Sequence, residues 1–250
     1  MQIKKALIIP DCHIPYHDKK AYNLMIQVAK DEQPDEIVIL GDYADFYGVN
    51  FHGKSPDVQE TLQDEVYMVH MELRKLRRTF PKAKIIYLEG NHEYRLARYI
   101  AARCPDLYGM IDVKSILELN SLKIHFVPYT PNQMYPVLGS KLLARHEPLA
   151  GGKHVAQNTV EKALSSVIFG HTHRIQEAQV VAIDGKNYRG ISSGWLGDET
   201  HPIFQYVKSH HQWAKGFSMV HVLPCGTWFN NLIHIIDHKL YYNGYIYEDV

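Results

Sequence analysis

Five short apolar runs in this 250-residue chain each lead into a motif rich in aspartate, asparagine or histidine, either directly or after one intervening residue. Short apolar runs followed by such polar motifs predict buried β-strands that end in loops. In α/β folds, ligand sites gather at the carboxyl ends of the strands, so we expect the five motifs to meet. The runs are 6–10, 36–40, 84–88, 141–145 and 166–169, and the motifs begin at Asp11, Gly41, Gly90, His146 and Gly170.

The residue types in these motifs are ligands for metal ions. Carboxylate and amide oxygens and imidazole nitrogens are the donors that hard and borderline divalent cations prefer. The chain also contains 16 histidines, more than packing alone requires, and five of them lie in the motifs. The sequence therefore predicts a metal site at the strand ends.

The order of the remaining elements predicts an α/β fold in a single domain that spans residues 1–250. In the first half, predicted strands alternate with predicted helices, which indicates right-handed crossovers and largely parallel pairing. The second half is richer in strands, so we expect a sandwich of sheets flanked by helices. We predict strands at 3–10, 36–41, 84–89, 122–127, 141–145, 166–169, 176–183, 187–192, 217–223, 228–236 and 240–247, and helices at 19–31, 60–79, 93–103, 106–119 and 153–164.

Composition limits the partners and the compartment. Lys+Arg and Asp+Glu balance at 27 each, so no global field attracts nucleic acid or an anionic membrane, although a local basic groove remains possible. Basic residues from Arg74 to Lys84 could form such a patch, but a solvated helix end is the stronger interpretation. Three widely spaced cysteines predict free thiols in a reducing compartment. No stretch approaches the roughly 18 apolar residues of a membrane span. We therefore expect a cytoplasmic protein.

In their order, Asp-x-His, Gly-Asp-x-x-Asp, Gly-Asn-His-Glu, an isolated histidine and Gly-His-x-His resemble the calcineurin-like metallophosphoesterase family over residues 11–173. The size and the strand-rich tail are similar to small single-domain members, including those carried by phages. The resemblance implies a four-layer sandwich of two mixed β-sheets flanked by helices. It also implies two divalent cations: Asp42 bridges them, Asp11, His13 and His173 hold the first, and Asn91, His146 and His171 hold the second.

The resemblance further implies the chemistry of the site. A hydroxide between the two ions would attack phosphorus, because metal charge lowers the pKa of bound water. His92 would not bind metal but would donate a proton to the leaving group. Asp45 would hold His92 in the required tautomer. We expect manganese, while iron, zinc, nickel and cobalt remain open because availability often decides.

Three departures from the family pattern bear on the substrate. Glu147 replaces the usual glycine after His146, which leaves His154 as a competing ligand candidate. Phe46 stands where phosphoprotein phosphatases carry an arginine that holds a phosphoryl group, and Pro10 replaces a glycine. We therefore expect a phosphodiesterase that acts on a nucleotide or on nucleic acid. The alternatives are a phosphomonoesterase for small metabolites or phosphoprotein and, in another class, a catalytically silent binding scaffold.

Substrate contacts have weaker signals. Arg95 could reach a phosphate, although pairing with Glu93 or exposure to solvent is an equal alternative. His17 and His52 lie in loops next to the first two motifs, where a surface or hydrogen-bonded role is the stronger interpretation. Trp195 could stack on a base, although packing is the commoner role of such a residue. Alternation along the strand points Cys12 away from the metals and into the core.

Overall fold

The first of two large sheets carries three of the five motifs. The computed structural model describes residues 2–51, 55–204 and 212–248. Its six-stranded sheet has the order β11-β10-β1-β2-β3-β4. The strands β1 to β4 are parallel, and β10 and β11 extend the sheet on the β1 side in antiparallel fashion. The strands are β1 (Lys4–Ile9), β2 (Glu36–Ile39), β3 (Lys84–Leu88), β4 (Ile124–Val127), β10 (Gly216–Val222) and β11 (Trp228–His234).

The second sheet carries the other two motifs. Its five strands have the order β5-β6-β7-β9-β8, in which β6, β7 and β9 are parallel and the two edge strands are antiparallel to their neighbours. The carboxyl ends of β6 and β7 therefore lie at the same edge of this sheet, just as the carboxyl ends of β1 to β3 share one edge of the first sheet. The strands are β5 (Tyr135–Pro136), β6 (Leu142–Arg145), β7 (Ser166–Phe169), β8 (Ile175–Val181) and β9 (Asn187–Ser193).

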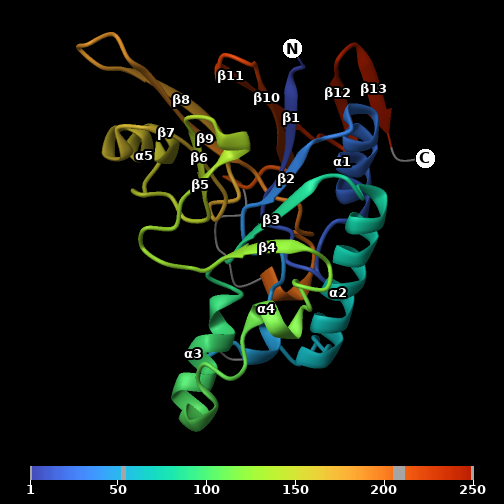
Figure 1. The fold of residues 1–250 in the computed structure, drawn as a ribbon. Helices are drawn as coiled ribbons and strands as arrows, with labels where there is room; N and C mark the ends of the chain where they lie inside the picture. The colour runs from blue at the N-terminus through green and yellow to red at the C-terminus, as the bar shows by residue number, and fades with distance from the viewer. Residues whose placement is uncertain (1, 52–54, 205–211, 249–250) are drawn as a thin grey trace.

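Helices cover the outer faces of both sheets. The helices α1 and α2 lie on one side of the molecule and α5 on the other, as Figure 1 shows. Among the residues that the structure describes, no helix is both long and apolar enough to cross a membrane. The helices are α1 (Lys19–Glu32), α2 (Leu62–Thr79), α3 (Tyr94–Arg103), α4 (Val113–Ile116) and α5 (Val155–Ala163), with short 3-10 turns at 47–49, 105–107, 137–139 and 202–204.

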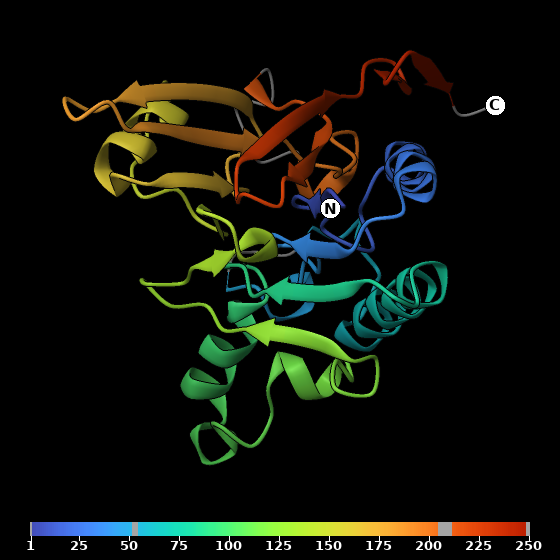
Figure 2. The same ribbon diagram turned by 45° about the horizontal axis from the view of Figure 1, so that its top comes forward.

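The alternation of side chains along each strand divides the core into layers. In β1, Leu7 and Ile9 pack against the α1 and α2 side, whereas Ala6 and Ile8 pack against the second sheet. A separate cluster packs α5 onto β7. The helix, sheet, sheet, helix order is the predicted four-layer sandwich of two mixed sheets, and Figure 2 shows the two sheets from above.

Three local predictions need correction. The helix expected at 106–119 is a 3-10 turn at 105–107 followed by the four-residue α4. The strand expected at 240–247 is the hairpin of β12 (Lys239–Tyr242) and β13 (Tyr245–Glu248). Its turn residues Asn243 and Gly244 both have positive φ, as a tight two-residue hairpin turn requires. The edge strand β5 was not expected at all.

Candidate metal centre

The five motifs meet at the carboxyl ends of β1, β2, β3, β6 and β7, as the pattern of strands predicts. Three clusters of potential ligand atoms result, and in each the atoms lie within 4.8 Å of one another. One contains Asp11, His13 and His173, and a second contains Asp42, His146 and His171. The third joins Asp42 to His13 and His92. We call Asp11, His13 and His173 the first group. We call His146, His171 and the neighbouring Asn91 the second group, and we treat Asp42 separately because it reaches both groups.

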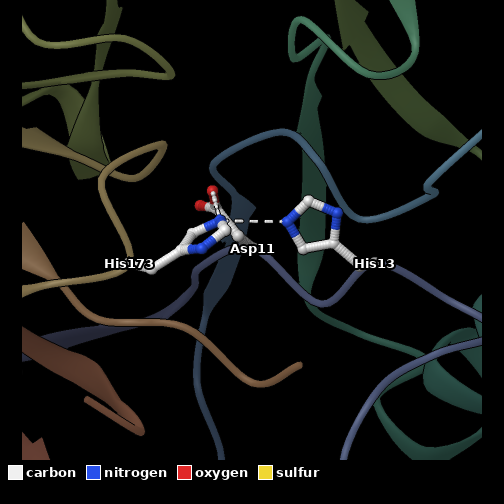
Figure 3. Close-up of side chains that lie close together, drawn as sticks. All are labelled: Asp11, His13 and His173. Atoms are coloured by element: carbon white, nitrogen blue, oxygen red, sulfur yellow. Dashed lines mark hydrogen bonds and ion pairs between the residues drawn. The ribbon is translucent and has the colours of Figure 1, made fainter. Parts of the chain in front are cut away.

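In the first group, three atoms that can bind a cation face one another. The Nε2 atoms of His13 and His173 are 3.0 Å apart, and His173 Nε2 lies 3.2 Å from Asp11 Oδ2, as Figure 3 shows. His13 Nδ1 lies 2.9 Å from the acceptor Asp45 Oδ2, so this nitrogen carries the proton. The neutral imidazole therefore presents its Nε2 lone pair to the other ligand atoms, and a cation between them fits this arrangement.

The second group repeats this arrangement. His146 Nδ1 donates to the carbonyl oxygen of Leu40 over 2.9 Å, so Nε2 is the nitrogen that faces the centre and could bind a cation after losing its proton. That atom lies 2.8 Å from Asn91 Oδ1 and 3.3 Å from Asp42 Oδ1. His171 Nδ1 lies 2.7 Å from the same Asn91 oxygen. Acceptor atoms converge on one another here also, which is the environment of a cation.

Asp42 reaches both groups. Its Oδ1 faces His146 and accepts a hydrogen bond from the backbone N–H of His92 over 2.8 Å. Asp42 also forms a third cluster with His13 and His92, again with all ligand atoms within 4.8 Å. A carboxylate in this position can give one oxygen to each of two neighbouring cations.

The charges of the centre favour a bound cation. Burial alone would raise the pKa of Asp42, but the imidazoles of His146 and His92 hold it well below its usual range. Burial lowers the pKa of His146, yet the carboxylates of Asp42 and Asp11 raise it to about 10. The buried carboxylates therefore stabilise positive charge in their surroundings, whether it comes from a proton or from a metal.

Four residues of the centre have positive φ values, which residues other than glycine rarely adopt. His13, Asp42, His171 and His173 have φ values of 55°, 45°, 64° and 57°. A non-glycine residue in the left-handed region costs on the order of 1 kcal/mol. Such strain at four positions in one site persists only because the surrounding hydrogen bonds and packing fix the loops.

Two glycines of the motifs leave room for carboxylates. A Cβ atom on Gly90 would lie 2.2 Å from Asp42 Oδ1, and one on Gly170 would lie 2.1 Å from Asp11 Oδ1. Neither contact is possible without displacement of a carboxylate. The glycines before Asn91 and His171 are therefore part of the geometry of the site.

Glu93 anchors the loops beneath the centre, a role that the sequence analysis missed. Its buried carboxylate accepts hydrogen bonds from the backbone N–H groups of Asp42 at 2.9 Å, Ala44 at 3.0 Å and Gly90 at 2.9 Å. The Tyr87 hydroxyl donates a fourth bond of 2.6 Å. Burial and the charge of Asp42 raise the pKa of Glu93 to about 7. The only sequence signal was its place in the Gly-Asn-His-Glu motif.

His92 lies beside the centre. Its Nδ1 is 3.1 Å from Asp45 Oδ2 and 3.2 Å from the Asp45 carbonyl oxygen, so Nδ1 carries a proton. Arg95 donates to His92 Nε2 over 2.9 Å and pairs with Asp45 Oδ1 at 3.2 Å. Arg95 thus pairs with Asp45 rather than with Glu93. Burial raises the pKa of Asp45, whereas His92 and His13 lower it. The pKa of Asp45 is therefore below its ordinary value.

Trp195 is not placed to stack on a base. Its side chain is 1% exposed and stacks on the His173 imidazole with ring centroids 4.7 Å apart. Phe204 and Trp213 complete this aromatic wall, which packs against His13 and His173. Packing behind the first group, the alternative given above, is the role that the structure shows.

The remaining candidates lie elsewhere. His17 packs on Tyr22, pairs its backbone with Gly197 and belongs to none of the ligand clusters found among the described residues. His52 lies outside the described residues. His154 is exposed and precedes α5, whereas His146 occupies the centre. Cys12 is fully buried in the core, as alternation predicts.

The fold and the ligand clusters define a protein of the metal-dependent phosphoesterase class. Residues 4–174 match the family model described as calcineurin-like phosphoesterase, and the chain belongs to this family. The chain is 24% identical to the Gene 54 protein of Mycobacterium phage L5 and 23% identical to that of Mycobacterium phage D29. Both alignments cover 98% of this chain and 99% of the relative.

Two solved structures with low sequence identity are also similar. Yfce, a phosphoesterase from E. coli, is 15% identical with a TM-score of 0.42, and the match covers 91% of this chain and 98% of that one. Vacuolar Protein Sorting 29 from Cryptosporidium parvum is 11% identical with a TM-score of 0.46, and the match covers 99% of both chains.

Proposed function

We propose that the protein is a dinuclear-metal-dependent phosphodiesterase that acts on a nucleotide or nucleic-acid phosphodiester. One observation carries the proposal: two sets of potential ligand atoms are joined by Asp42, and the His92 imidazole, hydrogen-bonded to Asp45, lies beside them. The first group and Asp42 would hold one cation, and the second group and Asp42 would hold the other. When bound, the two ions would stabilise charge on the phosphoryl oxygens and lower the pKa of a coordinated water.

His92 is the proposed proton donor to the leaving oxygen. Its Nδ1–H is held by Asp45, so Nε2 is the nitrogen that would exchange a proton with substrate. Burial lowers the pKa of His92, but the charges of Asp42 and Asp45 raise it above its ordinary value. A raised pKa favours the protonated imidazole, as a general acid requires.

Arg95 is the proposed contact to the phosphate. Its hydrogen bond to His92 Nε2 occupies the atom that the proton transfer needs, so substrate binding must shift the guanidinium. A phosphate oxygen beside His92 offers Arg95 a charged acceptor in exchange. The side chain is 15% exposed and reaches the centre from the first turn of α3.

The charge balance supports a diester rather than a monoester. Arg95, the proposed phosphate contact, is shared with Asp45 at 3.2 Å, so it offers a phosphate less than a full positive charge beyond that of the metals. Phe46 is 2% exposed and packs in the core beside α2, where it offers no charge to a phosphoryl group. A diester carries one negative charge less and fits this site better.

The donor set leaves the choice of metal broad. The clusters contain nitrogen and oxygen atoms only, and Cys12 contacts the carbonyl oxygen of Pro10 instead. We propose manganese, with iron, zinc, nickel and cobalt as the other metals that such a site accepts. Cys12, Cys104 and Cys225 are free thiols, which fits the proposed cytoplasmic location.

Hydrolysis of two chromogenic esters tests the proposal. With Mn²⁺, the protein should hydrolyse bis(p-nitrophenyl) phosphate faster than p-nitrophenyl phosphate, and a chelator should abolish both activities. Faster hydrolysis of the monoester would instead identify a phosphomonoesterase. Bound metal without turnover of either ester would favour a binding scaffold.

A further inference from the structure

The helix that follows the centre carries an unusual distribution of charge. α3 begins at Tyr94, directly after His92 and Glu93, and extends away from both sheets, as Figures 1 and 2 show. Its ten residues include Arg95, Arg98 and Arg103 and no acidic residue. In a chain whose formal charge is zero, this helix is a local basic element.

Two of the three arginines lie on one face of α3. Leu96 and Ile100 are buried and fix another face against the core. Positions 95, 98 and 99 have spacings of three and four, so Arg95, Arg98 and Tyr99 form one stripe along the helix. Arg103 follows Leu96 by seven residues and therefore lies on the Leu96 side, at the end of the helix. The stripe starts at Arg95, beside His92, and leads outward to solvent.

The basic groups farther along the helix are available to a ligand. Arg98 and Arg103 are exposed, and among the described residues neither forms an ion pair, whereas Arg95 pairs with Asp45. Arg103 also lies in the last turn of the helix, where it complements the helix dipole. Arg98 lies in the middle of the helix, where no such structural role accounts for it.

An exposed aromatic platform adjoins Arg98. The rings of Phe51 and Tyr99 are 6.1 Å apart, with 46% and 37% of each residue exposed. The Arg98 guanidinium lies over the Phe51 ring at 5.6 Å. Surfaces with exposed aromatic rings beside arginine bind single-stranded nucleic acids, because bases stack on the rings while phosphates bind the guanidinium groups.

We propose that the α3 face formed by Arg98 and Tyr99, together with Phe51, binds single-stranded nucleic acid next to the scissile phosphodiester. This inference rests on the proposed function for the position of the cleaved bond, and it adds the substrate class: a polynucleotide rather than a mononucleotide. Charge complementarity selects a polyanion, and the platform selects unpaired bases. A folded protein partner on the same face is the alternative outcome of the test.

Binding is measured without turnover. A fluorescent oligothymidylate of about 12 nucleotides is titrated with metal-free full-length protein in chelator, and anisotropy gives the affinity at several salt concentrations. Arg98→Glu should weaken binding at least tenfold and reduce the slope of log K against log salt by about 0.7 for each lost phosphate contact. Phe51→Ala should weaken binding about fivefold or more with an unchanged slope, because stacking carries no net charge.

Arg74→Glu is the matched control. Arg74 is exposed on α2. Arg74→Glu makes the same change of charge as Arg98→Glu but on another helix, so this variant should leave binding unchanged. Circular dichroism and thermal melting check that each variant folds, and Arg98→Ala serves as a milder substitution. Equal loss in Arg98→Glu and Arg74→Glu, or no loss in either, would overturn the assignment of α3.

Turnover separates this inference from the proposed function. With Mn²⁺, Arg98→Glu should lower kcat/KM for the oligonucleotide about tenfold and leave hydrolysis of bis(p-nitrophenyl) phosphate unchanged. If the wild-type protein hydrolyses the small diester but α3 variants bind the oligonucleotide normally, only the α3 assignment fails. If the wild-type protein hydrolyses nothing while Arg98→Glu alone loses binding, the α3 assignment stands and the phosphodiesterase fails.

Discussion

Gly170→Ala should damage the first group through a single added methyl group. The Cβ would lie 2.1 Å from Asp11 Oδ1, whereas real Cβ atoms essentially never approach closer than 3.0 Å. The carboxylate or the backbone must therefore move by about 1 Å. Asp11 is held by the His171 N–H at 2.8 and 3.0 Å, so it has no slack to absorb this shift. Displacement by about 1 Å costs roughly 10²-fold in rate at an organised active site.

The assay compares Gly170→Ala with Gly151→Ala. A Cβ on Gly151 meets nothing within 4 Å, and its φ is outside the left-handed region. Manganese content after dialysis and kcat/KM on bis(p-nitrophenyl) phosphate are measured for both variants. Gly170→Ala should lose metal affinity by 10-fold or more and activity by about 100-fold. If a folded Gly170→Ala keeps wild-type metal content and turnover, the assignment of Asp11 as a fixed ligand is refuted.

Three further perturbations address other parts of the centre. His92→Asn should keep both metals and lose roughly 10²–10⁴-fold in turnover, and elemental analysis that finds both ions gone would contradict its role as proton donor. Asp42→Asn should weaken both cations together, and retention of either one at wild-type affinity would argue against a shared ligand. Burial and the charge of Asp45 raise the pKa of Glu65 from 4.5 to about 7, so its contribution to stability is complete below pH 4.5 and is lost as the pH rises through 7. Urea unfolding should show Glu65→Gln with a pH dependence flatter by up to about 3 kcal/mol, and parallel curves would exclude the shift.

The sequence predicted that the motifs lie at strand ends because these signals are local. Each ligand motif follows directly on its strand, so the strand ends placed Asp11, Asp42 and His171 without knowledge of the tertiary fold. The surroundings of the ligands depend on contacts between distant segments. Trp195 and His173 stack across two loops, and nothing in the local pattern predicts that pair.

The role of Glu93, the C-terminal hairpin and the surface beside Arg98 were not predicted, each for a different physical reason. Glu93 accepts hydrogen bonds from four donors in two segments, 42–44 and 87–90, and a glutamate next to a helix start gives no sign of such a network. The hairpin at Asn243 and Gly244 had a clear local signal, since this dipeptide favours positive φ, but the alternating pattern continued through it. The aromatic platform beside Arg98 became visible only when the structure placed Phe51 next to α3.

Anomalous diffraction from crystals of manganese-loaded protein tests the central claim most directly. The account predicts two peaks about 3.5–4 Å apart on either side of the Asp42 carboxylate, one beside His13 and His173 and one beside His146 and His171. Elemental analysis of the same preparation should find two ions per chain. A single peak, or no peak at these residues in fully loaded protein, would contradict a centre in which Asp42 joins two cations.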